Sequence, residues 1–320
     1  MLCSRPGAAA FPGKEGFMLQ KQSHQGFVRS YFHQRPHIKY IAPAMTVLFI
    51  LSIVPTIFLF GVSFTNYQLG WDLSRAKFVG FNNYIRLFSG RDPDFWHAVY
   101  ISVGFMVLST SIEMILGFII ALMLNARESI FKPVIVGILI IPLAVTPTIA
   151  GQMWKLMFNA EYGLINYLLE LLFDTRVAWL SSEMAFWSIL IVDIWQFTPF
   201  VTLILYAGLR SVPKEPYESA MIDGAGRVRC FFYVTIPMMR SLILLAMLMR
   251  AVDSLKLFDT AFVLTQGGPG NATEFLSLHV YRMVNAQNGL IGRGAAVAIV
   301  LLVLVSCVSN VLIRFQQKET

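Results

Sequence analysis

The chain has 320 residues, of which 56% are hydrophobic and 13% are charged, and its mean hydropathy is +0.64. A soluble domain usually carries about one quarter charged residues, so this composition excludes a disordered chain and argues against a soluble globular one. The apolar residues gather in long runs, which indicates a polytopic membrane protein, and the net charge of +7 then indicates cytoplasmic anchoring, not nucleic-acid binding.

The N-terminal segment 1–37 is predicted to be a cytoplasmic tail. Residues 1–17 are rich in Gly, Ala and Pro and lack the apolar core of a signal peptide, and Met18 opens a more typical start. Residues 1–17 are therefore either an over-long start or a disordered tail. Neither alternative changes the predicted function.

Six apolar runs in residues 38–315 approach the roughly 20 residues needed to cross a bilayer. The sequence therefore predicts an all-α polytopic membrane protein with about six transmembrane helices, followed by a cytoplasmic tail at 316–320. Pro142 and Pro147 break the third run, which neighbouring helices can tolerate. The expected spans are Tyr40–Phe64, Ala98–Leu124, Phe131–Trp154, Met184–Leu209, Ser241–Leu264 and Gly294–Ile313.

The distribution of Lys and Arg predicts that both termini are cytoplasmic. With that orientation the inside segments hold 15 of these residues and the outside segments hold 8, and without residues 1–17 the counts are 13 and 8. A long external loop is then expected at Thr65–His97. Its residues 81–88 are predicted to form a short amphipathic helix at the outer membrane interface.

The fifth span carries four charges at steps of three, of alternating sign. Each would cost roughly 2.5–3.5 kcal/mol at the bilayer centre, so this helix is expected to be shielded inside the protein or to face a wet cavity. Neighbouring pairs lie close on a helix, and the alternative is a structural ion-pair ladder without ligand contact. The four residues are Arg250, Asp253, Lys256 and Asp259.

Polar residues of the fourth and fifth spans are the candidates for a mid-membrane substrate path. Sugars need paired hydrogen-bonding groups and an aromatic face, which Trp195 beside Gln196 offers. The alternative is that Trp195 only packs and the charges pair with each other. The candidates are Asp193, Trp195, Gln196, Asp253, Lys256 and Asp259.

Motifs of soluble enzymes are absent from the sequence. There is no Gly-Lys-Ser/Thr of a P-loop, no His-Glu-x-x-His, no Gly-x-Ser-x-Gly and no carboxylate cluster suited to a divalent metal. The three cysteines show no spacing typical of a disulfide framework, a metal site or a redox pair. We therefore predict no catalytic residue, no metal and no cofactor bound by this chain, so active transport would draw energy from an ion gradient or another subunit.

The fourth loop, residues 211–237, is the most informative segment. Pro213 and Pro216 suit the first turn of a helix, and Gly224 and Gly226 are expected to end it. A second short helix at Arg227–Val234 is expected to lead to a break at Pro237. By physical chemistry alone, this cytoplasmic hairpin is a solvated connector.

The residues of this loop nevertheless resemble the Glu-Ala-Ala loop of ABC importer permeases. Glu218-Ser219-Ala220 is followed after three residues by Gly224 and after nine more by Val234-Thr235-Ile236-Pro237. The family signature is Glu-Ala-Ala, three residues, Gly, nine residues and then Ile-x-Leu-Pro. In this chain Ser219 replaces the first Ala, Val234 replaces the Ile, and Ile236 replaces the Leu. In that family this helix docks into a cleft on the ATPase, so the resemblance implies coupling residues at Glu218, Ser219, Ala220, Asp223, Gly224, Ile236 and Pro237.

Further segments resemble the carbohydrate permeases of the MalF/UgpA type. They include Phe258-Asp259, the run Leu264–Gly270 with Thr273-Glu274, and Phe78-Val79-Gly80 with Asn83-Tyr84. The resemblance implies an inner-membrane subunit that imports a sugar or sugar-like solute, such as a polyol or glycerol phosphate. It also implies a second similar permease, two cytoplasmic ATPase subunits that use ATP and Mg, and an extracytoplasmic solute-binding protein.

Two other classes of function fit the sequence less well. An ion-gradient-driven secondary transporter would use Glu113, Asp193 and Asp253 as a proton or ion relay. Such folds usually contain internal repeats, and none relates the first three spans to the last three. An intramembrane enzyme lacks any nucleophile–base pair that the sequence shows.

Overall fold

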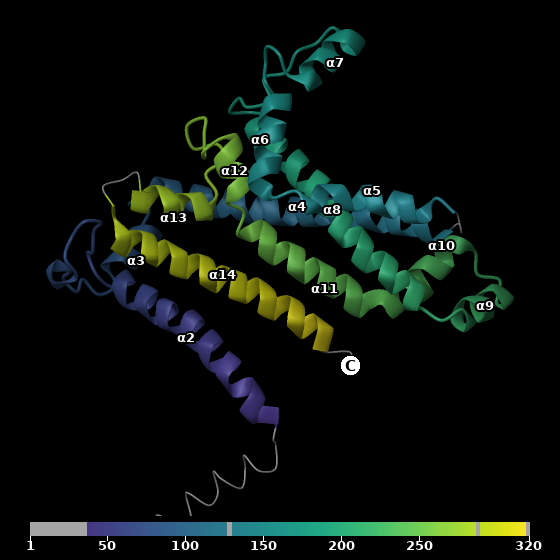
Figure 1. Ribbon diagram of the computed structural model, residues 1–320, viewed down its shortest axis with the longest axis horizontal. Helices are drawn as coiled ribbons and strands as arrows, with labels where there is room; N and C mark the ends of the chain where they lie inside the picture. The colour runs from purple at the N-terminus through teal and green to yellow at the C-terminus, as the bar shows by residue number, and fades with distance from the viewer. Residues whose placement is uncertain (1–36, 127–129, 286–288, 318–320) are drawn as a thin grey trace, which may run out of the picture. The chain divides into compact units, whose positions relative to one another are not determined.

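The computed structural model describes residues 37–126, 130–285 and 289–317 (Figure 1). The predictions for residues 1–36 and for the last three residues lie outside this part of the chain. Within it, regular structure is helical apart from one isolated antiparallel β-bridge between Thr65 and Phe78. The all-α fold predicted from the sequence is therefore confirmed.

The chain divides into two compact units, with the boundary after Leu59. The described part of the first unit lies in α2 (His37–Ser63), an apolar helix that contains Pro43 and Pro55. Its stretch Tyr40–Ser63 is long and apolar enough to cross a bilayer, which confirms the first expected span.

The second unit begins at Phe60 and contains the other apolar helices. Three expected spans correspond to single helices. Two of these helices extend beyond the predicted limits at both ends, and the third begins one residue after the predicted start and ends two residues after the predicted end. These helices are α4 (Pro93–Ala126), α8 (Ala185–Ser211) and α14 (Ile291–Gln317). The last helix includes residues 316 and 317, which the sequence had placed in a tail.

The third expected span is broken, as its prolines predict. It consists of α5 (Lys132–Ala144) and α6 (Pro147–Met157), which meet at an angle of 94°. Pro142 is accommodated inside α5, whereas Pro147 stands in the first turn of α6, where its missing N–H is not needed. The described chain thus has five spanning helices, or six if this bent pair is one span.

The fifth span differs from the prediction at both ends. Helix starts at α10 (Arg227–Cys230) and continues through one π-helical turn (Phe231–Thr235) into α11 (Ile236–Leu255), without the expected break at Pro237. Pro237 lies in the first turn of α11, and the wider π turn before it changes the hydrogen-bond register, so the ring is tolerated. At the other end α11 stops at Leu255, and α12 (Asp259–Leu264) is a separate helix.

Short helices occupy the connections. The segment between α2 and α4 contains the 3₁₀ turn η1 (Leu73–Arg75) and α3 (Asn82–Phe88), which confirms the helix predicted there. The expected external loop is shorter than Thr65–His97 because α4 already begins at Pro93. The other short helices are α7 (Leu164–Phe173), α9 (Glu215–Ile222) and α13 (Leu276–Asn285).

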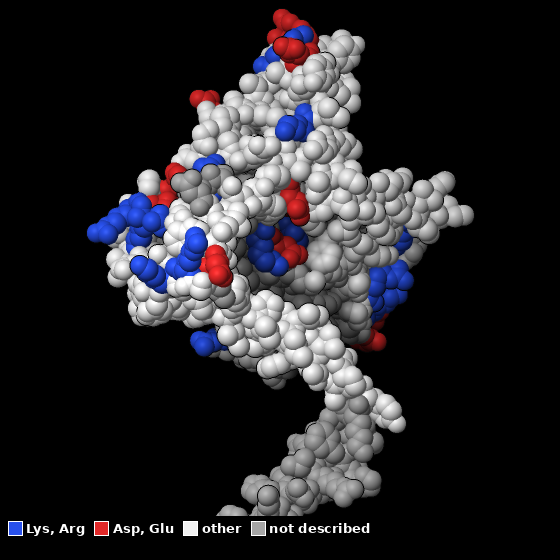
Figure 2. All heavy atoms as spheres, turned by 60° about the vertical axis from the view of Figure 1, so that its left-hand side comes forward, with Lys and Arg blue, Asp and Glu red and all other residues white. Residues whose placement is uncertain are grey.

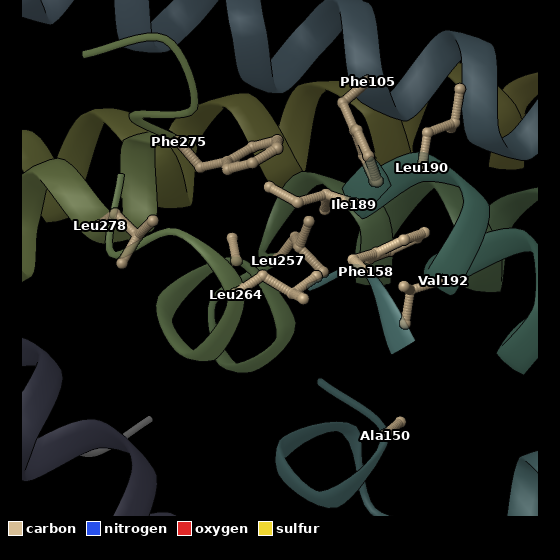
Figure 3. Packing of buried hydrophobic residues seen from close by; sticks show 11 residues of the cluster. Phe105, Ala150, Phe158, Ile189, Leu190, Val192, Leu257, Leu264, Phe275 and Leu278 are labelled. Atoms are coloured by element: carbon tan, nitrogen blue, oxygen red, sulfur yellow. The ribbon is translucent and has the colours of Figure 1, made fainter. Parts of the chain in front are cut away.

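One apolar cluster joins the spanning helices to the short ones (Figure 3). Phe105 of α4 and Ile189 of α8 are fully buried, and they meet Leu264 of α12 and Phe275, the residue before α13. The rings of Phe105 and Phe275 pack edge to face with centroids 5.1 Å apart. This packing fixes α12 and the loop after it on the α4–α8 pair.

On the face shown in Figure 2, charged side chains gather in separate groups with uncharged surface between them, as expected for a membrane protein.

Candidate functional site

The predicted coupling loop contains α9, a tight turn and α10. Pro216 stands in the first turn of α9, and Glu215 and Glu218 lie near its positive end, where carboxylates are favoured. At the other end, the Gly224 N–H donates to the Met221 carbonyl (3.1 Å) and the Ala225 N–H to the Ala220 carbonyl (2.9 Å).

This pair of hydrogen bonds is the Schellman motif, which requires a left-handed residue after the helix. Gly224 supplies it with a φ of +80°, as the sequence predicts, whereas Gly226 has a φ of −73°. The sequence therefore determines where α9 ends, and it does so through Gly224 and not through both glycines.

Contacts to the spanning helices hold this loop in place. The Tyr217 hydroxyl lies 2.9 Å from the Thr235 hydroxyl, which joins α9 to the π-helical turn. Phe231 packs edge to face on Phe118 of α4, with ring centroids 5.2 Å apart. A displacement of α9 would therefore be transmitted to α4 and α11 through packed side chains.

Several large apolar side chains of the same loop are exposed. Ile222, at the end of α9, has 86% of its surface exposed, and Val228, at the start of α10, has 72%. Such apolar groups beside carboxylates are typical of a surface that receives a protein partner. The others are Met221, Phe232 and Tyr233.

The predicted coupling residues occupy different parts of this surface. Glu218 is exposed and lines a cavity of about 610 Å³ between the end of α8 and α9. Ser219, Asp223 and Gly224 are also exposed on α9 and its turn. Ile236 is half-buried and Pro237 is exposed at the start of α11, beyond the π turn, so the loop as a whole forms one surface but not one cluster of side chains.

A cluster of buried charges lies within the spanning helices. Arg250 of α11 holds Glu113 of α4 with two nitrogens, at 2.5 and 2.8 Å, and Asp193 of α8 at 2.9 Å. All three side chains are at most 1% exposed. Ser254 accepts a further hydrogen bond from Arg250, and the ring of Phe197 lies 4.0 Å from its guanidinium carbon.

This arrangement contradicts the alternative of an ion-pair ladder along the fifth span. Arg250 pairs across helices and not with Asp253, because only α4 and α8 can surround its guanidinium with carboxylates away from lipid. Of the ladder only the exposed pair Asp253–Lys256 forms, at 3.5 Å. Asp259 is exposed on α12, beyond the end of α11.

The structure separates the candidates for the substrate path into two groups. Asp193 and Gln196 are buried in the α4–α8 packing, and Gln196 donates to the Val145 carbonyl (2.7 Å), freed at the break between α5 and α6. Trp195 packs edge to face on Trp154, with centroids 5.6 Å apart. Asp253, Lys256 and Asp259 form a separate exposed group near the end of α11. No ligand contact of these residues is tested, and the path stays a prediction.

The carbohydrate-permease motif lies in the loop between α12 and α13. The Thr265 and Thr273 hydroxyls are 2.7 Å apart, and the Thr273 N–H donates to the Gly267 carbonyl (3.1 Å). Glu274 is fully buried and binds both His279 (2.7 Å) and Arg282 of α13. Threonine side chains and one carboxylate therefore hold this glycine-rich loop in a single shape.

A second cluster of charges joins this loop to the start of α4. His279 lies between Glu274 and Asp92, whose carboxylate oxygen is 3.3 Å from Nε2. Burial alone would lower the pKa of His279, but the contact with the Asp92 carboxylate, the hydrogen bond to Glu274 and the charges of both raise it to about 9. Burial alone would raise the pKa of Asp92, but the contact with the charged His279 ring brings it below its ordinary value.

The sequence analysis did not predict the ion pairs of either buried cluster. Glu113 entered only as part of an ion relay, and no local pattern pairs it with Arg250, 137 positions away. The group around His279 left one usable signal, since His279 and Arg282 are three positions apart, which suits one face of a short helix, and the carboxylate of Glu274 stands a few residues before them.

Comparison with known proteins places this geometry in context. Residues 113–318 match the family described as binding-protein-dependent transport system inner membrane component. The trehalose/maltose transport system permease protein MalF of Thermococcus litoralis is 39% identical over 83% of this chain and 88% of its own length. The sulfoquinovosyl glycerol transport system permease protein SmoG of Agrobacterium fabrum is 33% identical over 86% of this chain and 88% of its own.

A solved structure shows the same fold. In the crystal structure of a bacterial ABC transporter involved in the import of the acidic polysaccharide alginate, one chain superposes with a TM-score of 0.76 at 18% identity. The match covers 92% of this chain and 99% of that one. The two chains therefore share one fold over almost their whole length.

Proposed function

Because the chain belongs to the binding-protein-dependent transport system inner membrane components, we propose that it is the permease of an ABC importer for a sugar or sugar-like solute. The observation that carries the substrate class is the similarity to permeases whose names give trehalose, maltose and sulfoquinovosyl glycerol, over more than four fifths of the chain. Polyols and glycerol phosphate fall within the same proposal.

The proposed assembly contains four kinds of protein. A second similar permease lies beside this chain in the cell inner membrane, two ATPase subunits bind on the cytoplasmic side, and a solute-binding protein docks outside. Both termini of this chain are cytoplasmic, as the charge asymmetry predicts. ATP and Mg are used by the ATPase subunits, and this chain contributes no catalytic residue.

The proposed mechanism is alternating access driven from the coupling loop. Closure of the ATPase dimer on ATP moves α9, and the contacts Tyr217–Thr235 and Phe231–Phe118 carry that motion into α11 and α4. The permease pair opens outward toward the loaded binding protein, and hydrolysis resets it. Such a switch needs two states and differential contacts at both faces.

The ion-driven alternative has weaker support. Its relay needs buried and available carboxylates, but Glu113 and Asp193 both bind Arg250, and Asp253 is exposed. It also leaves the coupling loop without a role. The exposed apolar groups on α9 and α10 favour a protein partner at that surface.

The experiment is uptake by proteoliposomes that contain this chain with its permease, ATPase and binding-protein partners. We expect uptake of labelled trehalose, maltose or a related glycoside that requires ATP inside and the binding protein outside. A protonophore should leave this uptake unchanged. Uptake that persists without the ATPase and collapses with the protonophore would replace this proposal with the ion-driven one.

A further inference from the structure

A polar cavity of about 380 Å³ lies between the segment after α2 and the start of α14. Three arginines from three separate segments line it, namely Arg86 of α3, Arg91 of the turn before α4 and Arg293 of α14. Basic side chains are visible on this side of the molecule in Figure 2, where the α3 and α13 side of Figure 1 comes forward. We call it the three-arginine cavity.

The walls of the three-arginine cavity are held by the backbone. The Leu69 N–H donates to the Gly289 carbonyl (2.8 Å), and the Gly292 N–H donates to the Tyr67 carbonyl (2.9 Å). Gly292 permits this approach, since a Cβ there would lie 2.1 Å from the Thr65 oxygen. Asn83 adds hydrogen bonds to the Ser63 and Thr65 carbonyls, at 2.7 and 2.9 Å. A ligand would therefore meet a preorganised site, which reduces the entropy lost on binding.

The charges in this cavity are not balanced by the described part of the chain. There, the guanidinium groups of Arg86, Arg91 and Arg293 have no ion pair or hydrogen bond. The charge of Arg86 acts unfavourably on Arg293, and the smaller opposite effect comes from Asp92, which is also bound to His279. An anion between the guanidinium groups would remove this repulsion. Arginine forks match phosphate oxygens in geometry as well as charge.

The depth of the cavity indicates which anion reaches it. It lies where α2 ends at Ser63 and α14 begins at Ile291, and both helices are candidate spans, so it is at the level of lipid headgroups. Beside it, α3 and its preceding residue present Phe81, Ile85 and Phe88, each more than half exposed. Aromatic and aliphatic groups on a short helix at this level are typical of an element that lies in the membrane interface.

From this juxtaposition we propose that the three-arginine cavity binds the phosphate group of a membrane phospholipid, with the exposed apolar face of α3 against its acyl chains. Phosphatidylglycerol, with its net negative charge, is the preferred class. The bound lipid would hold α3 and the start of α14 together at the membrane surface. The inference does not depend on which solute the transporter carries.

The test is native mass spectrometry of the assembled transporter released from nanodiscs that contain phosphatidylglycerol and phosphatidylcholine in equal amounts. We expect retained phosphatidylglycerol on the unmodified protein and at least a roughly tenfold loss of retention in the double variant Arg86→Gln/Arg293→Gln, because a single charged hydrogen bond is already worth about that factor. The matched control is Arg75→Gln/Lys77→Gln, which also removes two positive charges, from exposed positions outside the cavity. Its retention should be unchanged, and matched unfolding midpoints show that each variant is folded.

Further arms distinguish the sources of the anion. Inorganic phosphate added at millimolar concentration should not displace the lipid, since it lacks the acyl chains. Displacement by phosphate alone, or equal retention in the double variant and the control, would overturn the proposal. So would a double variant that keeps its lipid but binds the solute-binding protein less tightly, because the cavity would then receive a carboxylate of that protein.

Discussion

The coupling loop and the buried charge cluster differ in whether their charged side chains are paired and buried. In the cluster, Arg250, Glu113 and Asp193 find their partners within the chain and are hidden from solvent. In the coupling loop, Glu218 and Ile222 are exposed, and within the described residues no ion pair holds Glu218. A cluster whose charges are all paired within the chain stabilises the fold. A region with exposed charged and apolar side chains is suited to binding a partner protein.

The largest effect is expected from removing the guanidinium of the buried cluster. Arg250→Met leaves two buried carboxylates without a cation, which should lower the free energy of unfolding by about 3–5 kcal/mol. Thermal unfolding in detergent, followed by size-exclusion chromatography, measures this. Because uncharged packing often replaces a buried ion pair without loss, Arg250→Met combined with Glu113→Leu and Asp193→Leu should recover much of the stability. A single variant as stable as the unmodified chain would contradict the assignment.

The coupling loop should show the reverse, lost function with stability kept. Glu218→Lys or Gly224→Asp should leave the subunit inserted but weaken ATPase retention and stop uptake. The first variant reverses a charge at the contact, and the second puts a side chain at a φ of +80°. ATPase retained on membranes and sugar uptake are measured at matched permease abundance.

The matched control for the glycine is Gly226→Ala. Gly226 has a φ of −73°, which any residue adopts, so this variant should retain both ATPase binding and uptake. Normal coupling in Gly224→Asp and Glu218→Lys would mean that the loop does not link ATP to transport.

A smaller, pH-dependent effect is expected at the second cluster of charges. The pKa of His279 is about 9 in the folded chain against an ordinary 6.5, so protonation stabilises the fold. This contribution is full below about pH 6.5 and is lost as the pH rises through 9. Arg282 and Glu274 stay beside it, and the Asp92 carboxylate is ionised throughout this range because its pKa is lowered.

The difference between unfolding midpoints at pH 6.5 and pH 9.5 measures this contribution. It should shrink in His279→Gln, which has no charge to lose, and it should persist in His97→Gln, whose ring binds the Asn271 carbonyl and lies outside the cluster. An equal pH response in His279→Gln and the unmodified chain would assign the effect to other groups.

The smallest effect is expected from the exposed pair on the same stretch as Arg250. Lys256→Met removes an ion pair with Asp253 whose two side chains are about half exposed, and it should change the free energy of unfolding by no more than about 1 kcal/mol. The same unfolding assay compares it directly with Arg250→Met. A loss as large as that of Arg250→Met would show that exposure does not separate the two sites.

The sequence by itself determined the features that depend on neighbouring residues. Apolar runs placed the spans, Pro147 placed the break in the third, and Gly224 placed the end of α9, because hydrophobic length and backbone conformation are local properties. The class of protein followed from the resemblance of this loop to the Glu-Ala-Ala loop of ABC importer permeases, which is readable in the sequence because Glu218 and Gly224 keep their distance along the chain in any fold.

Only the tertiary structure decided which charges pair. Arg250 binds Glu113 and not Asp253, because α4 and α8 enclose its side chain while Asp253 points to the exposed side of the same helix. The tertiary structure also showed that the helix continues through Pro237, because the π turn before it alters the hydrogen-bond register. Pairings between distant segments depend on how helices pack, and one-dimensional spacing carries no information on packing partners.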